Sequence, residues 1–131
     1  MKWVFNKNRP IYTQLIEHLQ RGILTGEYPQ DSTIPSVRLL ALEAGVNPNT
    51  MQKALSALEL QGLLFSKRTI GRFVTNNIQA IENLKEKLTI EQVDMYFNNM
   101  KLIGIGEKEA ARIITSKVKK IGNVDTEKFY T

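Results

Sequence analysis

The fold of this chain is decided by the stretch Asn47-Pro48-Asn49-Thr50-Met51-Gln52-Lys53-Ala54-Leu55. Asn47 is a favoured N-cap residue, and Pro48 suits the first helical position because its missing N–H costs no helical hydrogen bond there. We therefore expect a helix that begins at Pro48 and ends before Gly62, which interrupts the helical pattern.

This expected helix has one apolar face and one polar face, because each kind of residue recurs at helical spacing. The apolar face holds Met51, Ala54, Leu55 and Leu58, and the polar face holds Asn49, Gln52, Lys53 and Ser56. Asn and Gln pair with adenine edges in the major groove of DNA, and Lys reaches guanine or phosphate. The polar face therefore suits nucleic acid, although an ordinary solvated helix face is the alternative.

Two further helices are expected before this one. The first lies within residues 10–26, where apolar residues recur at helical spacing. Ser36 is expected to cap the second, which Gly45 ends. Because only Val46 separates Gly45 from Asn47, a short turn joins the second and third helices, which is the helix-turn-helix arrangement.

A β-hairpin is expected after the third helix. Residues 63–68 and 72–75 are apolar and β-prone, and Thr69-Ile70-Gly71 makes a tight connection between them. Three cations stand around the expected tip, namely Lys67, Arg68 and Arg72. Such a hairpin is called a wing. Because it lies beside the third helix, the candidate recognition helix, its basic residues favour contact with phosphate or the minor groove. The alternative is a charged strand edge that serves only to prevent aggregation.

Residues 77–122 predict two more helices, which carry long apolar stripes. The stripes include Ile81, Leu84, Leu88, Val93, Tyr96, Phe97, Met100, Ile113, Ile114 and Val118. Two helices alone cannot bury so much apolar surface, so we expect them to pack on the preceding domain, on a second copy of the chain, or on both. A dimer would give two recognition helices the two-fold relationship that palindromic DNA sites require.

These elements predict a mainly α-helical fold with a small β-hairpin. We expect a winged helix-turn-helix domain at residues 1–76, a two-helix dimerisation region at residues 77–122 and a polar tail at residues 123–131. Trp3 and Phe5 precede the first helix, and the sequence gives them no clear place.

The charge of the chain is unevenly distributed. Its 131 residues have a net charge of +5. Residues 1–76 carry nine Lys and Arg against five Asp and Glu, whereas residues 77–131 carry nine against eight. Because positive charge favours polyanions, we expect the first part to face nucleic acid and the second to act as a neutral scaffold.

The composition also argues against several function classes. The chain has no Cys and one His, His18, which excludes the usual nitrogen and sulfur metal sites. It contains no Gly-rich phosphate loop and no plausible catalytic set around its histidine, so we predict neither enzyme activity nor a cofactor. Without a signal peptide or an apolar run that could cross a bilayer, we expect a cytoplasmic protein with no membrane partner.

Four motifs together resemble the N-terminal winged-helix domain of GntR-type bacterial transcription regulators. They are Ile34-Pro35-Ser36-Val37-Arg38-Leu39-Leu40-Ala41, Gly45-Val46-Asn47-Pro48-Asn49-Thr50-Met51-Gln52-Lys53-Ala54, Leu58-Glu59-Leu60-Gln61-Gly62-Leu63 and Gly71-Arg72-Phe73-Val74. Pro10-Ile11-Tyr12, Asn47-Pro48-Asn49-Thr50 and the brief C-terminal part resemble the YtrA subfamily in particular.

The resemblance implies a homodimeric transcription regulator, usually a repressor and often encoded with a transporter, that binds a palindromic operator in double-stranded DNA. It assigns the DNA contacts to Arg38, Asn47, Pro48, Asn49, Thr50, Gln52, Lys53, Lys67, Arg68, Thr69, Gly71 and Arg72. The chain departs from the family at Thr69, where the wing commonly has Gly, and at Lys53, where Arg is frequent. Only 55 residues follow Asn76, too few for the large effector-binding domain of other subfamilies, so any effector is unknown.

The alternative is a winged-helix module that binds protein instead of DNA. Such a module would favour an apolar recognition helix, and the polar face of residues 49–56 argues against it.

Overall fold

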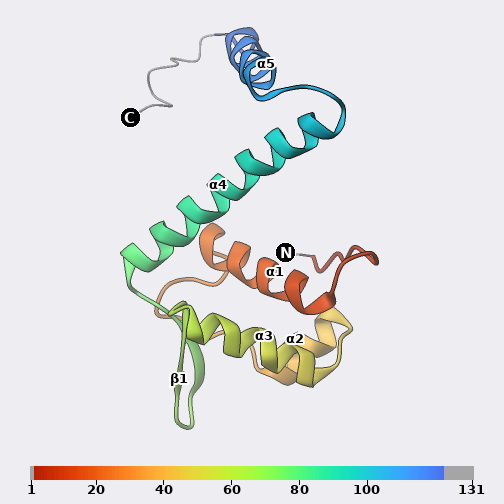
Figure 1. Cartoon of the computed structure of the whole chain (residues 1–131). Coiled ribbons are helices and arrows are strands. Elements are labelled where there is room, and N and C mark those ends of the chain that lie inside the picture. Colours follow the sequence, from red (N-terminus) through yellow and green to blue (C-terminus); the bar gives the residue numbers. More distant parts are fainter. Residues whose placement is uncertain (1, 123–131) are drawn as a thin grey trace. The chain divides into compact units, whose positions relative to one another are not determined.

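The structure, a computed structural model, describes residues 2–122. These residues form α1 (Ile11–Thr25), α2 (Val37–Ala44), α3 (Pro48–Leu60), the strands β1 (Leu64–Lys67) and β2 (Gly71–Val74), α4 (Ile78–Leu102) and α5 (Glu107–Lys120) (Figure 1). The fold is mainly α-helical with one β-hairpin, and it is a winged helix followed by C-terminal helices. This confirms the predicted fold class. The polar tail predicted at residues 123–131 lies outside the described residues.

The chain divides into two compact units, residues 1–85 and residues 86–131. The first unit holds α1, α2, α3, the hairpin and the start of α4, and the second holds the rest of α4 and α5. The division therefore falls inside α4.

Side-chain caps start the two helices of the helix-turn-helix. Ser36 Oγ accepts a hydrogen bond from the backbone N–H of Leu39 at 3.2 Å, and Asn47 Oδ1 accepts one from the N–H of Asn49 at 2.8 Å. Gly45 follows α2 in the left-handed conformation, with φ of 69°. Both predicted caps and the predicted turn are confirmed, because each depends on residues adjacent in sequence.

The core of the first unit surrounds α3, which contacts α1, α2 and β1 (Figure 1). Met51, Ala54, Leu55 and Leu58 are each 0% exposed, which confirms the predicted apolar face of this helix. The other large, fully buried apolar side chains of this core are Leu15, Leu19, Leu40, Leu63, Leu64 and Val74.

The hairpin projects beyond the helices of the first unit (Figure 1). Its strands are antiparallel, and Lys67 pairs with Gly71 at the tip end. The segment before α2 runs beside β2, because Ile34 N–H donates to the carbonyl of Arg72 at 3.0 Å and Thr33 bridges Phe73. Backbone hydrogen bonds thus anchor β2 of the wing to the segment before α2.

The N-terminal segment is held against α1, and this gives Trp3 and Phe5 a place. The Trp3 ring stacks on the imidazole of His18 with 3.6 Å between ring centroids, and Phe5 lies beside Trp3 at 6.3 Å. The Gln14 side chain accepts a hydrogen bond from Asn6 N–H at 2.7 Å and donates one to the Asn6 carbonyl at 2.8 Å.

We expect the stability of the chain to depend on pH through His18. This side chain is 3% exposed, and its Nε2 atom has no hydrogen-bond partner among residues 2–122. Burial, together with the charge of Arg21, lowers the pKa of His18 below its usual 6.5. The unfolded chain then binds more protons than the folded one, so the free energy of unfolding should decline as the pH falls below about 6.5.

Urea unfolding between about pH 7.5 and about pH 5.5 tests this expectation. The wild-type chain should lose more stability over this range than His18→Gln, which cannot take up the proton. Equal losses in the two proteins would contradict it.

Candidate nucleic-acid interface

The α3 helix presents a polar face to solvent. Asn49, Gln52 and Lys53 are exposed and Ser56 is half-buried, whereas the opposite face is wholly buried. Thr50 is half-buried, and its N–H donates to the carbonyl of Asn47 within the cap. The predicted polar stripe is therefore a rigidly held surface on the first turns of a capped helix.

An open groove runs along this polar face. It is lined by Tyr12, Thr50, Gln52, Lys53, Ser56, Ala57 and Leu60. Tyr12 comes from α1 and is 40% exposed. Tyr12 was not among the site residues predicted from the sequence, although its position off the apolar stripe of α1 is a signal that could have identified it.

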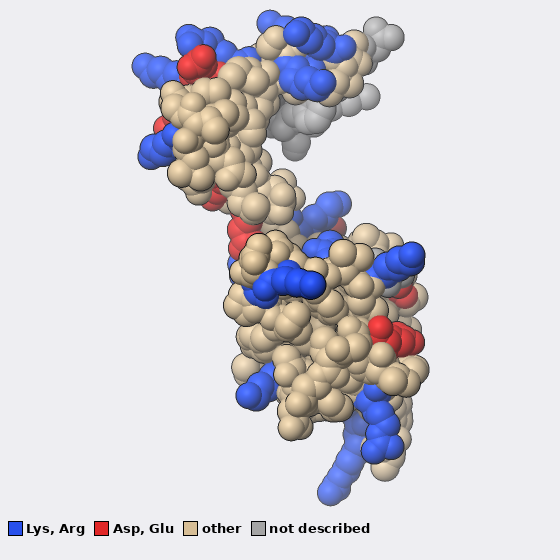
Figure 2. Space-filling view, turned by 90° about the vertical axis from the view of Figure 1, so that its right-hand side faces the viewer, with Lys and Arg blue, Asp and Glu red and all other residues tan. Residues whose placement is uncertain are grey.

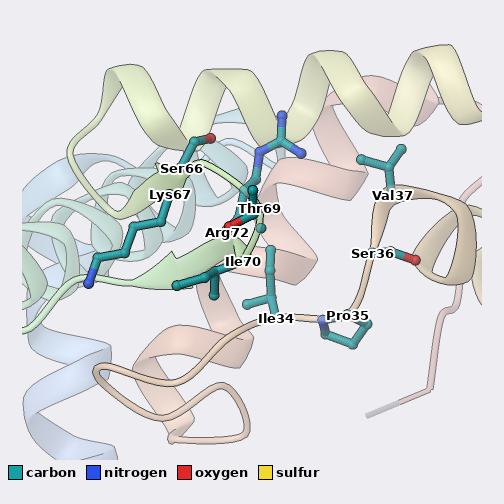
Figure 3. Close-up of a pocket in the computed structure, with 10 residues that line it drawn as sticks. Ile34, Pro35, Ser36, Val37, Ser66, Lys67, Thr69, Ile70 and Arg72 are labelled. Atoms are coloured by element: carbon teal, nitrogen blue, oxygen red, sulfur yellow. The ribbon is translucent and has the colours of Figure 1, made fainter.

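The wing carries its cations in two different environments. Lys67 and Arg68 are exposed at the tip end of the hairpin, and the Lys67 ammonium lies 4.5 Å from the centroid of the Phe73 ring. Arg72 instead pairs its Nε with a carboxylate oxygen of Glu59 on α3, and its side chain is only 16% exposed. Figure 3 shows Arg72 directed toward a helix and Lys67 extending the other way. The three cations predicted around the tip thus do not form one cluster.

A second hollow lies between the wing and the start of α2 (Figure 3). Its lining is Ile34, Pro35, Ser36, Val37, Ser66, Lys67, Thr69, Ile70, Gly71 and Arg72. Arg38 directly follows Val37 of this lining, in the first turn of α2, and it is exposed. Figure 2 shows Lys and Arg side chains projecting at the hairpin end of this unit.

The tip of the wing has an unusual backbone at Thr69. Its φ is 72°, and Gly71 has a φ of 106°. The left-handed region costs an L-residue about 1–2 kcal/mol, and a β-branched residue is rare there. A Gly at position 69 would avoid this cost, so the departure from the family pattern leaves strain at the tip.

The second unit packs α4 against α5. The Tyr96 hydroxyl donates to the carbonyl of Ala110 at 2.8 Å, and Tyr96 and Phe97 make an edge-to-face pair with centroids 5.2 Å apart. Ala110 is 0% exposed. This small core occupies only part of the apolar surface of the two helices.

The predicted dimerisation residues differ in exposure. Leu84 is already buried within the single chain, at 7% exposed, so it has little surface left for a second copy. Half-buried side chains are Ile81, Leu88, Tyr96, Phe97, Met100 and Val118, and exposed ones are Val93, Ile113 and Ile114. Ile90 and Met95 of α4 were not among the predicted residues, yet both are exposed and apolar.

Residues 2–122 contain neither a metal-binding cluster nor a membrane-spanning helix. No group of three or more Asp, Glu or His side chains there could hold a metal ion. In the same residues, no helix combines the length and apolar character needed to cross a membrane.

Comparison with known proteins gives a family. The model of the family described as "Bacterial regulatory proteins, gntR family" matches residues 11–74. The uncharacterized HTH-type transcriptional regulator YhcF of Bacillus subtilis is 31% identical over 105 residues, which cover 80% of this chain and 87% of YhcF. The HTH-type transcriptional repressor YtrA of the same organism is 30% identical over 99 residues, 71% of this chain and 76% of YtrA.

Solved structures agree with this result. A GntR family transcriptional regulator from Listeria monocytogenes is 28% identical with a TM-score of 0.75, and the match covers 86% of this chain and 98% of that one. The DNA-binding domain of AraR in complex with operator ORX1 is 32% identical with a TM-score of 0.50, over 57% of this chain and 92% of that domain. The chain therefore belongs to the gntR family of bacterial regulatory proteins and is a DNA-binding transcription regulator of that type.

Proposed function

We propose that this chain is a homodimeric repressor of the YtrA subfamily that binds a palindromic operator. In this proposal α3 reads bases in the major groove and the wing contacts the DNA backbone or the minor groove. The protein acts in the cytoplasm, without enzyme activity, and regulates a transporter-type operon.

One observation carries the proposal, namely the two faces of α3. Asn49, Gln52 and Lys53 are exposed just after a capped helix start, and the other face of the helix is anchored in the core. The N-terminal residues of a recognition helix are the ones that reach base edges in helix-turn-helix complexes. The AraR domain, which is similar to this part of the chain, forms a complex with an operator.

The remaining DNA contacts are proposed from placement and charge. Arg38 is exposed in the first turn of α2. A cation there opposes the helix dipole, so helix stability does not explain an arginine at this position. A contact with a DNA phosphate does. Lys67 and Arg68 are exposed on the wing and suit phosphates or a narrow minor groove. Arg72 is proposed to act through its ion pair with Glu59 more than through direct contact with DNA.

Dimerisation is proposed through residues 77–122. Val93, Ile113 and Ile114 remain 38–47% exposed in the single chain, and Ile90 and Met95 are each 53% exposed. Apolar surface of this kind marks interaction sites in soluble proteins, and a second copy would supply matching residues.

The subfamily and the repressor role are proposed from a residue pattern and from one relative. Pro10-Ile11-Tyr12 and the short C-terminal part resemble the YtrA subfamily, and the repressor YtrA is among the relatives. YhcF is similar to a slightly greater extent, and its name specifies a regulator without specifying repression.

Selection of bound sequences from random double-stranded DNA tests the proposal. We expect the enriched sequence to be palindromic, with half-site centres about one helical turn apart or a multiple of it. Sedimentation equilibrium of the free protein should give twice the chain mass of 14.9 kDa. A monomer at micromolar concentration would contradict the dimer, and a lack of any enriched sequence would favour the protein-binding alternative.

A further inference from the structure

We propose that Glu59 is a positioning residue that fixes the orientation of the wing relative to the recognition helix. This inference rests on the proposed function, because its consequence is that Lys67 and Arg68 meet DNA in a fixed geometry while α3 lies in the major groove.

One carboxylate oxygen ties both strands of the wing to α3. Glu59 Oε1 accepts a hydrogen bond from Ser66 Oγ at 2.6 Å and another from Arg72 Nε at 2.5 Å. Ser66 and Arg72 are directly opposite each other in the hairpin, on β1 and β2. Among the described residues, these are the side-chain hydrogen bonds that join α3 to the hairpin, so both strands are held at the same level by a single group.

The position of this link along the hairpin matters. Toward the base, Val74 N–H donates to the Ser32 carbonyl at 2.9 Å and Thr75 N–H donates to the Leu63 carbonyl at 3.0 Å. Glu59 acts nearer the tip, one residue pair before the pair of Lys67 with Gly71, at the level where Ile34 N–H donates to the Arg72 carbonyl at 3.0 Å. That backbone bond ties β2 to the segment before α2, whereas Glu59 ties both strands to α3. A link that holds both strands at this level restrains the hairpin relative to α3.

The link is stronger than an ordinary surface ion pair. The side chains of Arg72 and Glu59 are only 16% and 31% exposed, so solvent screens their interaction less. The hydrogen bond from Ser66, followed by the hydrogen bond and charge of Arg72, lowers the pKa of the Glu59 carboxyl. Glu59 is therefore ionised at neutral pH, the state in which it accepts both bonds.

Positioning and simple electrostatics predict opposite results when Glu59 is neutralised. Removal of a negative charge near a DNA-binding surface should by itself tighten binding, and it would also free Arg72 for a phosphate. If Glu59 positions the wing, its replacement should weaken binding instead, because the cations of the wing no longer meet their phosphates in one arrangement. The sign of the change separates the two accounts.

The test compares Glu59→Gln and Ser66→Ala with wild-type protein on the DNA enriched by selection. Glu59→Gln should bind about tenfold more weakly, and the salt slope of log K should shrink by about 0.9 for each phosphate that the wing no longer neutralises. Ser66→Ala removes one of the two bonds without a change in charge, so a smaller loss of about twofold to threefold is expected. Glu43→Gln is the matched control, because Glu43 is an exposed carboxylate on α2 outside the proposed contacts, and its affinity should stay the same or rise slightly.

A measurement on the free protein separates failure of this inference from failure of DNA binding. The ¹⁵N heteronuclear Overhauser effect of residues 66–72 should fall in Glu59→Gln and stay at the wild-type value in Glu43→Gln, because the wing gains fast motion only when the link is broken. Unchanged values, or equal or tighter DNA binding by Glu59→Gln, would overturn the inference. If the wild-type protein enriched no DNA, the proposed function would fail, while a fall in these values would still show that Glu59 restrains the hairpin.

Discussion

Replacement of Gln52 or Asn49 by alanine is expected to cost about 1–3 kcal/mol of discrimination at particular base pairs of the operator. Both side chains are exposed on the first two turns of α3, and each can form a two-bond pair with a base edge. In a symmetric dimer the loss should appear at equivalent positions in both half-sites. Affinity for unrelated DNA should change little, because phosphate contacts supply most of it.

Competition binding against operators substituted one base pair at a time measures this effect. Lys67→Ala serves as the control, because removal of a phosphate-binding cation weakens binding to all sequences alike and reduces the salt slope by about 0.9. If Gln52→Ala and Asn49→Ala kept the wild-type preference at every position, α3 would not be the element that reads the sequence.

Leu55→Ala is expected to lower the free energy of unfolding by about 2–5 kcal/mol. Leu55 is 0% exposed in the core around α3, so truncation removes buried apolar surface and leaves a cavity. A loss of this size is a large part of the total stability of a small domain, about 5–15 kcal/mol. We therefore expect Leu55→Ala to lose DNA binding near physiological temperature as well.

Leu60→Ala is the matched control for this prediction. It is the same substitution on the same helix, but Leu60 is 91% exposed, so its effect should stay within about 0.5 kcal/mol. Urea unfolding of both variants gives the comparison. Similar losses for the two would mean that the core does not lie where the structure places it.

The parts of the fold that the sequence predicted best depend on neighbouring residues. Asn47 and Pro48 mark the start of α3 by a side-chain cap and a ring conformation, and neither depends on the rest of the chain. The apolar period that runs through Met51 and Leu58 likewise identifies the buried face without any tertiary information.

The parts that could not be predicted depend on residues far apart in sequence. Glu59 and Arg72 are 13 residues apart, and they meet only because the hairpin folds back beside α3 in one register. From the sequence alone, Arg72 cannot be distinguished from the other two cations of the wing, Lys67 and Arg68. Leu84 lies on the expected apolar stripe, but whether it faces this chain or a second copy depends on the packing of the whole unit.

The stacking of Trp3 on His18 also gives the molecule an optical reporter. Trp3 is the single tryptophan of the chain, so its fluorescence comes from one place, the contact between the N-terminal segment and α1. Protonation of an adjacent imidazole quenches indole emission, and detachment of the segment exposes the ring to water and shifts the emission to longer wavelength. Quenching and wavelength therefore distinguish titration of His18 from release of the segment, without any label on the protein.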